Sequence, residues 1–127
     1  MLIVEARQAR RRTLHDLLAA VFPETRILLA DSGASALATC GAERPQVVLL
    51  DSGLPDADGI ELTEQLRTYS PAPAVIVISD LGRPEDAVRA RAAGACAFIA
   101  RDQLATALVP AVARALGITR LDRPKKP

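Results

Sequence analysis

Aromatic residues and metal-ligating residues are scarce in this 127-residue sequence. It contains two Phe, one Tyr and no Trp, and so few rings argue against a surface that stacks nucleic-acid bases. His15 is the single histidine, and Cys40 and Cys96 stand far apart with no CxxC pair. A zinc site needs more nitrogen and sulfur ligands at closer spacing. We therefore expect two reduced thiols and no zinc site.

Long apolar runs and a strong net charge are also missing. No run approaches the roughly 20 residues of a membrane span, and the first apolar stretch is too short for a signal peptide and precedes its basic residues. The formal charge of +1 argues against nucleic-acid binding by charge alone. The dinucleotide-binding pattern of glycines is absent after the first apolar stretch, where EARQAR stands. We expect a cytoplasmic protein that contacts neither membrane nor nucleic acid directly.

Short apolar segments alternate with amphipathic ones along the whole chain. Half of the residues are hydrophobic, which is enough to bury a core. Strands are predicted at 2–4, 26–30, 47–50, 74–78 and 96–99, and helices at 8–21, 32–43, 60–68, 84–94 and 104–116. Pro110 lies inside the last helix, which we expect to be kinked or to start late. Short linkers between alternating elements favour right-handed crossovers, so the pattern predicts an α/β fold with a doubly wound, five-stranded parallel sheet.

Polar side chains follow the predicted strands at one edge of this sheet. Glu5 follows the first strand, Asp51 the third, Ser79 and Asp80 the fourth, and Arg101 the fifth. Ligands of such sheets bind beyond the carboxyl ends of the strands. Because the third strand is apolar throughout, it is expected to be central and buried on both faces. Asp51 is therefore the leading candidate for a functional residue.

Four segments make the sequence resemble the receiver domains of bacterial two-component response regulators, over residues 1–117. VVLLDSGLPDADGIEL resembles the central strand and the loop after the phospho-acceptor Asp, with Pro55, Asp58 and Gly59 placed as in members with LuxR-type output domains. IVEAR resembles the first strand with its acidic pair, VIVIS the strand that ends on Ser or Thr, and AGACAFIARD the segment with the switch aromatic. The resemblance implies a flavodoxin-like (CheY-like) sheet of order 2-1-3-4-5.

The resemblance also implies roles for individual residues. Asp51 takes the phospho-acceptor position, Glu5 the first acidic position, and Gly53 would offer its carbonyl to Mg²⁺. Ser79 takes the hydroxyl that bonds the phosphoryl group, and Phe98 the switch aromatic that follows its movement.

Two positions depart from the family pattern. Ala6 stands where the family has an acid that binds Mg²⁺ directly, and Arg101 stands where it has a Lys. Mg²⁺ would thus lose one of its few carboxylates, while a guanidinium forms a planar fork that can pair with a carboxylate. Our hypothesis is that Arg101 pairs with Asp51 in the resting state and takes over part of the metal's charge role.

Three functions are compatible with this pattern. The favoured one is an atypical receiver domain that acts through protein contacts, with weak or absent Mg²⁺-dependent phosphorylation. The alternative is a conventional receiver that accepts phosphate on Asp51 and controls transcription through an output domain absent from this chain. An aspartyl-phosphate hydrolase ranks lowest, because its usual acid/base Asp would fall on Gly53. Beyond phosphorylation and dephosphorylation of Asp51 itself, we expect no enzymatic activity.

The resemblance implies partners as well. These are a sensor histidine kinase or another signalling protein, a LuxR-type output domain in a longer chain, and a second copy. A homodimer would use the face of the fourth helix, fifth strand and fifth helix, or the first helix. Residues 118–127 are expected to be a flexible tail or the start of a linker.

Overall fold

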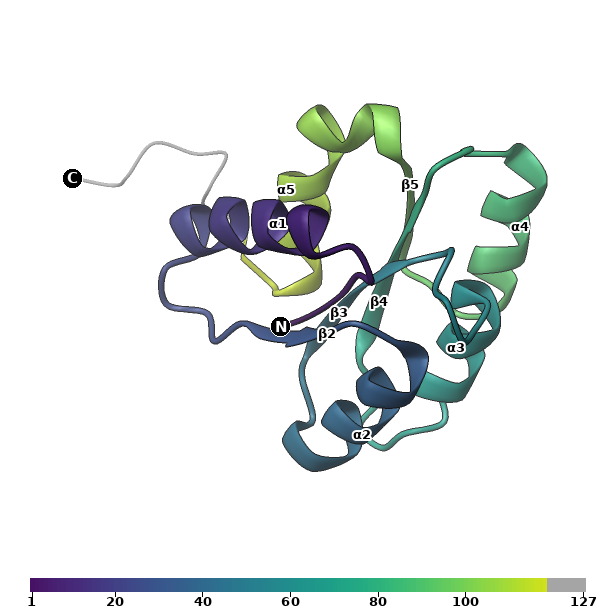
Figure 1. Cartoon of the computed structure of the whole chain (residues 1–127), viewed down its shortest axis with the longest axis horizontal. Helices are drawn as coiled ribbons and strands as arrows, with labels where there is room; N and C mark the ends of the chain where they lie inside the picture. The colour runs from purple at the N-terminus through teal and green to yellow at the C-terminus, as the bar shows by residue number, and fades with distance from the viewer. Residues whose placement is uncertain (119–127) are drawn as a thin grey trace.

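Five parallel strands form the centre of the molecule in the computed structural model, which describes residues 1–118. Their order is β2-β1-β3-β4-β5 (Figure 1), so the predicted fold class and strand order are confirmed. The strands are β1 (Leu2–Val4), β2 (Leu28–Ala30), β3 (Val47–Asp51), β4 (Ala74–Ser79) and β5 (Ala97–Ala100).

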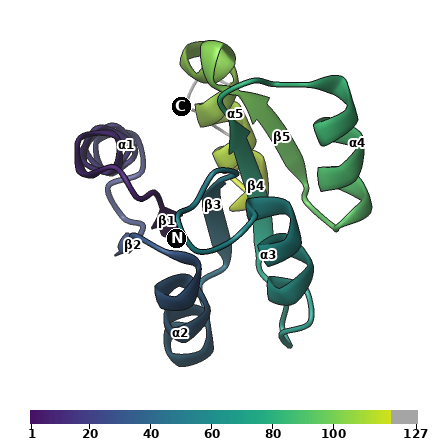
Figure 2. The same ribbon diagram turned by 45° about the vertical axis from the view of Figure 1, so that its right-hand side comes forward.

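Four α-helices connect the strands, a fifth follows β5, and together they cover both faces of the sheet (Figure 2). They are α1 (Gln8–Val21), α2 (Gly33–Glu43), α3 (Gly59–Leu66), α4 (Pro84–Ala92) and α5 (Leu104–Ala115), and a short 3-10 helix, η1 (Arg101–Gln103), precedes α5. Helices α1 and α5 pack on one face, and α2, α3 and α4 pack on the other. No helix among residues 1–118 is long and apolar enough to cross a membrane.

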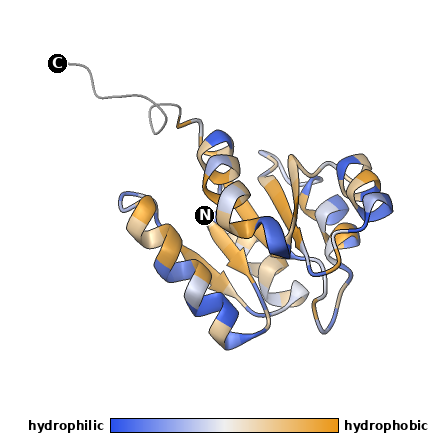
Figure 3. Cartoon of the chain, turned by 90° about the horizontal axis from the view of Figure 1, so that it is seen from above, coloured by the Kyte–Doolittle hydropathy of each residue, from blue (hydrophilic) through white to orange (hydrophobic). Residues whose placement is uncertain are grey.

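The sheet divides the hydrophobic core into two clusters. Alternate residues of β3 and β4 point to opposite faces, so Val48 and Leu50 join the cluster under α2 and α3, whereas Leu49 joins the cluster under α1 and α5. Figure 3 shows the strands as the most hydrophobic part of the chain, between helices with one polar side. Burial on both faces explains why β3 and β4 are apolar runs without polar alternation.

The element boundaries differ from the predictions by a few residues. Strand β2 begins at Leu28 rather than at 26, and α3 ends at Leu66 rather than near 68. Helix α5 begins at Leu104 and runs unbroken through Pro110, so a late start was wrong. Pro110 lies on the exposed side of α5, where a hydrogen bond lost to the proline ring leaves a carbonyl that water can reach.

Candidate functional site

The polar residues predicted to gather at one edge of the sheet do lie together there. In the register of the sheet, Val4 is paired with Leu50 and Asp51 with Ile78, which brings Glu5, Asp51 and Ser79 side by side at the carboxyl ends of β1, β3 and β4. All three are buried, with exposed fractions of 1%, 7% and 4%. Buried carboxylates require compensating charges or hydrogen bonds, so their partners define this site.

Arg101 is the main partner of the two buried carboxylates. Its Nη2 donates to Oδ1 of Asp51 at 3.0 Å and lies 3.4 Å from Oε1 of Glu5. The contact predicted between Arg101 and Asp51 is therefore present. It is made by a single nitrogen instead of the two-pronged pairing that a guanidinium can form, because the group is shared among several carboxylates.

Asp80 is a third carboxylate on Arg101, and the sequence analysis did not identify this contact. Nε of Arg101 donates to Oδ1 of Asp80, and the same oxygen accepts from Nη1 of Arg10 on α1 at 3.3 Å. The sequence places Asp80 and Arg101 at the same edge, but their contact follows from the register, in which Ser79 is paired with Ala100. Arg10, Asp80, Arg101 and Asp51 thus form a continuous series of contacts from α1 to the end of β3.

The turn between β1 and α1 fixes Glu5 from its other side. Oε2 of Glu5 accepts from the backbone N–H of Arg7 at 2.9 Å. The guanidinium of Arg11 donates to the carbonyl of Glu5 at 2.8 Å and to that of Ala6 at 3.3 Å. Arg10 and Arg11, two consecutive basic residues of α1, therefore both have contacts at the site.

The electrostatic environment separates Asp51 from Asp80. Burial raises the pKa of Asp51, the charges of Glu5 and Asp80 raise it further, and Arg101 offsets only part of this effect. The hydrogen bond from Arg101 lowers the pKa of Asp80, with help from the charges of Arg101 and Arg10. Partial burial works to lower the pKa of Arg101, but the hydrogen bond and charges of its carboxylate partners outweigh it and raise that pKa. Arg101 thus stabilises the charged form of Asp80 enough to lower its pKa, whereas its effect on Asp51 does not overcome the effect of burial.

The loop after Asp51 is held by two aspartates that cap helices. The carboxylate of Asp58 accepts from the N–H of Ile60 at 2.7 Å and so caps α3. The carboxylate of Asp56 accepts from Gly33 at 2.7 Å and from Ala34 at 3.1 Å, at the start of α2. The backbone beside Asp51 is therefore tied to two helices.

Gly59 lets this loop pack closely against the end of β3. A Cβ on Gly59 would lie 2.6 Å from Cα of Ser52 and 2.7 Å from the carbonyl oxygen of Asp51. Both neighbours are backbone atoms, which cannot move aside as a side chain can. The Gly of the sequence motif is therefore explained by contact with the Asp51 backbone.

Ser79 and Phe98 occupy the places predicted for them, on adjacent strands. Oγ of Ser79 accepts from the backbone N–H of Gly82 at 3.1 Å. Phe98 is partly buried, packs against the cluster under α2, α3 and α4, and is paired with Val77. In this conformation the Ser79 hydroxyl is engaged by the loop that leads to α4.

The donor set that Mg²⁺ would need does not fit this arrangement. Both buried carboxylates, Glu5 and Asp51, are contacted by the guanidinium of Arg101, and Ala6 has no side-chain oxygen. Mg²⁺ requires oxygen ligands at about 2.0–2.1 Å in octahedral geometry, whereas Arg101 contacts one oxygen of each carboxylate and the second oxygen of Glu5 accepts from the backbone N–H of Arg7. Among residues 1–118, no group of three or more His, Cys, Asp or Glu side chains is placed to hold a metal ion.

Comparison with known proteins identifies the family. The model of the response regulator receiver domain matches residues 1–113. This chain belongs to the response regulator receiver domains. The receiver is 37% identical over 101 residues to the KDP operon transcriptional regulatory protein KdpE of Escherichia coli, and the match covers 80% of this chain and 44% of that protein. The probable transcriptional regulatory protein NarL of Mycobacterium tuberculosis is 36% identical over 83 residues, or 65% of this chain and 38% of NarL.

Solved structures agree with the fold. The receiver domain of a DNA-binding response regulator from Colwellia psychrerythraea superposes with a TM-score of 0.84 at 21% identity, covering 91% of this chain and 96% of that one. NtrX from Brucella abortus gives a TM-score of 0.80 at 30% identity, covering 91% of this chain and 26% of NtrX. The receiver thus spans less than half the length of the curated relatives KdpE and NarL.

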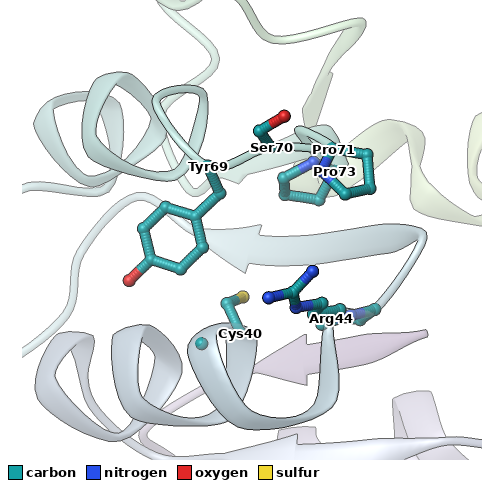
Figure 4. Close-up of a pocket in the computed structure, with 8 residues that line it drawn as sticks. Cys40, Arg44, Tyr69, Ser70, Pro71 and Pro73 are labelled. Atoms are coloured by element: carbon teal, nitrogen blue, oxygen red, sulfur yellow. The ribbon is translucent and has the colours of Figure 1, made fainter.

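A pocket lies away from Asp51, where α2 ends and the chain leaves α3 for β4. Figure 4 shows Tyr69, Pro71 and Pro73 on one side of this pocket and Cys40 and Arg44 on the other. Burial raises the pKa of the Cys40 thiol to about 11, so the thiol is protonated at neutral pH and is a poor nucleophile. The Cys40 thiol therefore gives this pocket no reactive group at neutral pH.

Proposed function

We propose that this domain is an atypical receiver that signals through protein contacts, with weak or absent Mg²⁺-dependent phosphorylation of Asp51. The single observation that carries the proposal is the position of Arg101 Nη2, within 3.0 Å of Asp51 and 3.4 Å of Glu5. A carboxylate that attacks an anionic phosphoryl donor needs its charge offset by cations. Here the offset comes from a side chain of the protein.

The charge balance of the site supports this proposal. The three carboxylates of Glu5, Asp51 and Asp80 face the guanidiniums of Arg101 and Arg10, which leaves one net negative charge. A divalent cation on Glu5 and Asp51 would lie against the Arg101 guanidinium and be repelled by it. Ala6 removes a carboxylate that could have held the cation elsewhere. A site with these charges favours the guanidinium over Mg²⁺.

The decisive experiment is a titration with beryllofluoride, a phosphoryl mimic, in the presence of Mg²⁺. The expected result for the wild-type domain is no stoichiometric binding, measured by calorimetry and by ¹⁹F NMR. The matched variant restores the family pattern by combining Ala6→Asp with Arg101→Lys, and it is expected to gain Mg²⁺-dependent binding. Stoichiometric wild-type binding that Asp51→Asn abolishes would overturn the proposal in favour of a conventional receiver.

The conventional function remains the second candidate, on two observations. Asp51 and Ser79 lie at the same edge of the sheet, as phosphoryl transfer and a hydroxyl switch require. The relatives KdpE and NarL are named as transcriptional regulators and are more than twice as long as the matched region. In this function a sensor kinase phosphorylates Asp51, and a LuxR-type output domain in a longer chain acts on transcription in the cytoplasm.

Hydrolysis of external phosphate esters is not proposed. Gly53, two residues after Asp51, has no side chain that could act as the second acid/base group of such an enzyme.

A second copy of this chain, which would form a homodimer, is a further partner expected from the sequence. Its predicted face contains many alanines: Ala87, Ala90, Ala92, Ala93, Ala105, Ala107, Ala111 and Ala113. Ala90, Ala111 and Ala113 are buried against the sheet, so they serve the core, and the exposed Ala92 and Ala105 are left to contact a second copy.

A further inference from the structure

The guanidinium of Arg101 is far from its own backbone when it reaches Asp51. Arg101 begins η1 after β5, and β4 lies between β5 and β3 in the sheet. A long side chain that crosses a neighbouring strand loses much conformational freedom. Something at the end of β4 must therefore hold it in this extended position.

Asp80 stands at that point. Its Oδ1 accepts from Nε of Arg101, while Nη2 of the same guanidinium reaches Asp51 and Glu5. Because the guanidinium is planar and rigid, fixing Nε sets the direction in which Nη2 points. Asp80 thus contacts the group that contacts the phospho-acceptor, and it does not contact the phospho-acceptor itself.

Arg10 on α1 is a second partner of Asp80. Its Nη1 lies 3.3 Å from the Asp80 oxygen that Arg101 also contacts. The side chain of Arg101 is only 19% exposed, whereas that of Asp80 is 49% exposed. The chain of contacts therefore runs from the surface of α1 into the buried site.

We propose that Asp80 is a positioning residue, which holds Arg101 across the end of β4 so that its guanidinium lies on Asp51 and Glu5. Arg10 braces Asp80 from α1. The inference rests on the proposed function, because it names the residue that keeps the internal cation in place. The competing interpretation is an ordinary exposed ion pair, which contributes little and would leave Arg101 in position when Asp80 is changed.

The test is the NMR signal of the Arg101 side-chain Nε–Hε group, assigned by its loss in Arg101→Lys. In the wild-type domain this proton should be shifted downfield and protected from exchange with water by its charge-assisted bond to Asp80. In Asp80→Asn the downfield shift of this proton should be lost. The Nη protons of Arg101 that contact Asp51 should lose protection as well, with exchange at least about tenfold faster, since bonds to charged groups contribute that much.

Two matched variants test whether the effect on Arg101 is specific to the carboxylate of Asp80. Asp51→Asn changes the same chemistry on the other side of the guanidinium and should leave the Nε–Hε signal in place. Asp102→Asn removes an exposed carboxylate next to Arg101 in the sequence and should also leave it in place. Backbone amide spectra verify that each variant is folded.

Retained protection of the Arg101 Nη protons in Asp80→Asn would overturn the inference, and so would loss of the Nε–Hε signal in Asp51→Asn, where Asp80 is intact. Neither result depends on whether the wild-type domain binds beryllofluoride. Failure of this inference and failure of the proposed function are therefore distinguishable.

Discussion

At the scale of single residues, Asp51 and Asp80 are opposites in the same charge network. Burial raises the pKa of Asp51 above its ordinary value of 3.8, so the native state binds a proton there more readily than the unfolded state does. The hydrogen bond from Arg101 lowers the pKa of Asp80 below 3.8. The two aspartates should therefore have opposite effects on stability as a function of pH.

The first prediction follows from these signs. The cost of the Asp51 carboxylate grows as pH rises from 3.8 through its raised native pKa, so Asp51→Asn should raise Tm at pH 7. Asp80 contributes stability above pH 3.8 that is lost as pH falls through its lowered native pKa, so Asp80→Asn should lower Tm at pH 7. Thermal unfolding followed by circular dichroism between pH 3 and 8 measures both. Equal effects of the same sign would contradict the assigned environments.

Much of this residue-scale arrangement was predictable from the sequence. The apolar strands locate Glu5, Asp51, Ser79 and Arg101 at one edge, and the choice of Arg over Lys indicated a contact with Asp51. The sequence did not predict that the Arg101 guanidinium contacts three carboxylates, those of Glu5, Asp51 and Asp80, at the same time. It depends on how far a side chain extends across β4, which strand order and register determine.

At the scale of elements, the α3 connection is the clearest link between sequence and site. Asp58 caps the helix, and Gly59 brings its first turn against the backbone of Ser52 and Asp51. The same few residues therefore start a helix and fix the position of the functional Asp.

The second prediction concerns Gly59. Gly59→Ala places a Cβ within 2.7 Å of the Asp51 carbonyl oxygen, so the loop must shift. We expect a loss of about 1–3 kcal/mol in the free energy of unfolding, the usual cost of overpacking. Urea denaturation measures it. Gly41→Ala is the control, since only Tyr69 lies near its Cβ position, at 4.0 Å, and it should not destabilise the domain.

Element boundaries were less predictable than element types. The predicted strand at 26–30 is shorter because only Leu28–Ala30 is paired with β1, and strand ends depend on the neighbouring strand rather than on local sequence. Pro110 suggested a kinked or late-starting helix, and α5 does not start late, because a proline on an exposed helix side leaves its lost hydrogen-bond acceptor to water. Hydrophobic periodicity indicates which helix face is buried, but it does not indicate whether the exposed face can accept a proline.

At the scale of the whole molecule, the Asp51 edge joins elements from both ends of the chain. Glu5 lies near the N-terminus and Arg101 lies 96 residues later, and their contact links the ends of β1 and β5. The domain therefore completes its charge network only when β5 has docked on β4.

The third prediction is that folding stability does not depend on divalent cations. A resident cation at one hundred times its Kd would add about 2.7 kcal/mol, so its removal would lower Tm. We expect the same Tm in EDTA and in millimolar Mg²⁺ for the wild-type domain. The combined Ala6→Asp and Arg101→Lys variant should instead be stabilised by Mg²⁺. A wild-type Tm that rises with Mg²⁺ concentration would contradict this expectation.

The guanidinium of Arg101 has one more consequence. A metal ion equilibrates with the solution, so its occupancy follows the composition of the cell, whereas a side chain is present at a fixed ratio of one to one. In the function proposed above, Arg101 makes folding itself assemble the resting site, without a pool of ions. A partner that competes for Arg10 on α1 would then change the site by releasing Asp80 and, through it, Arg101.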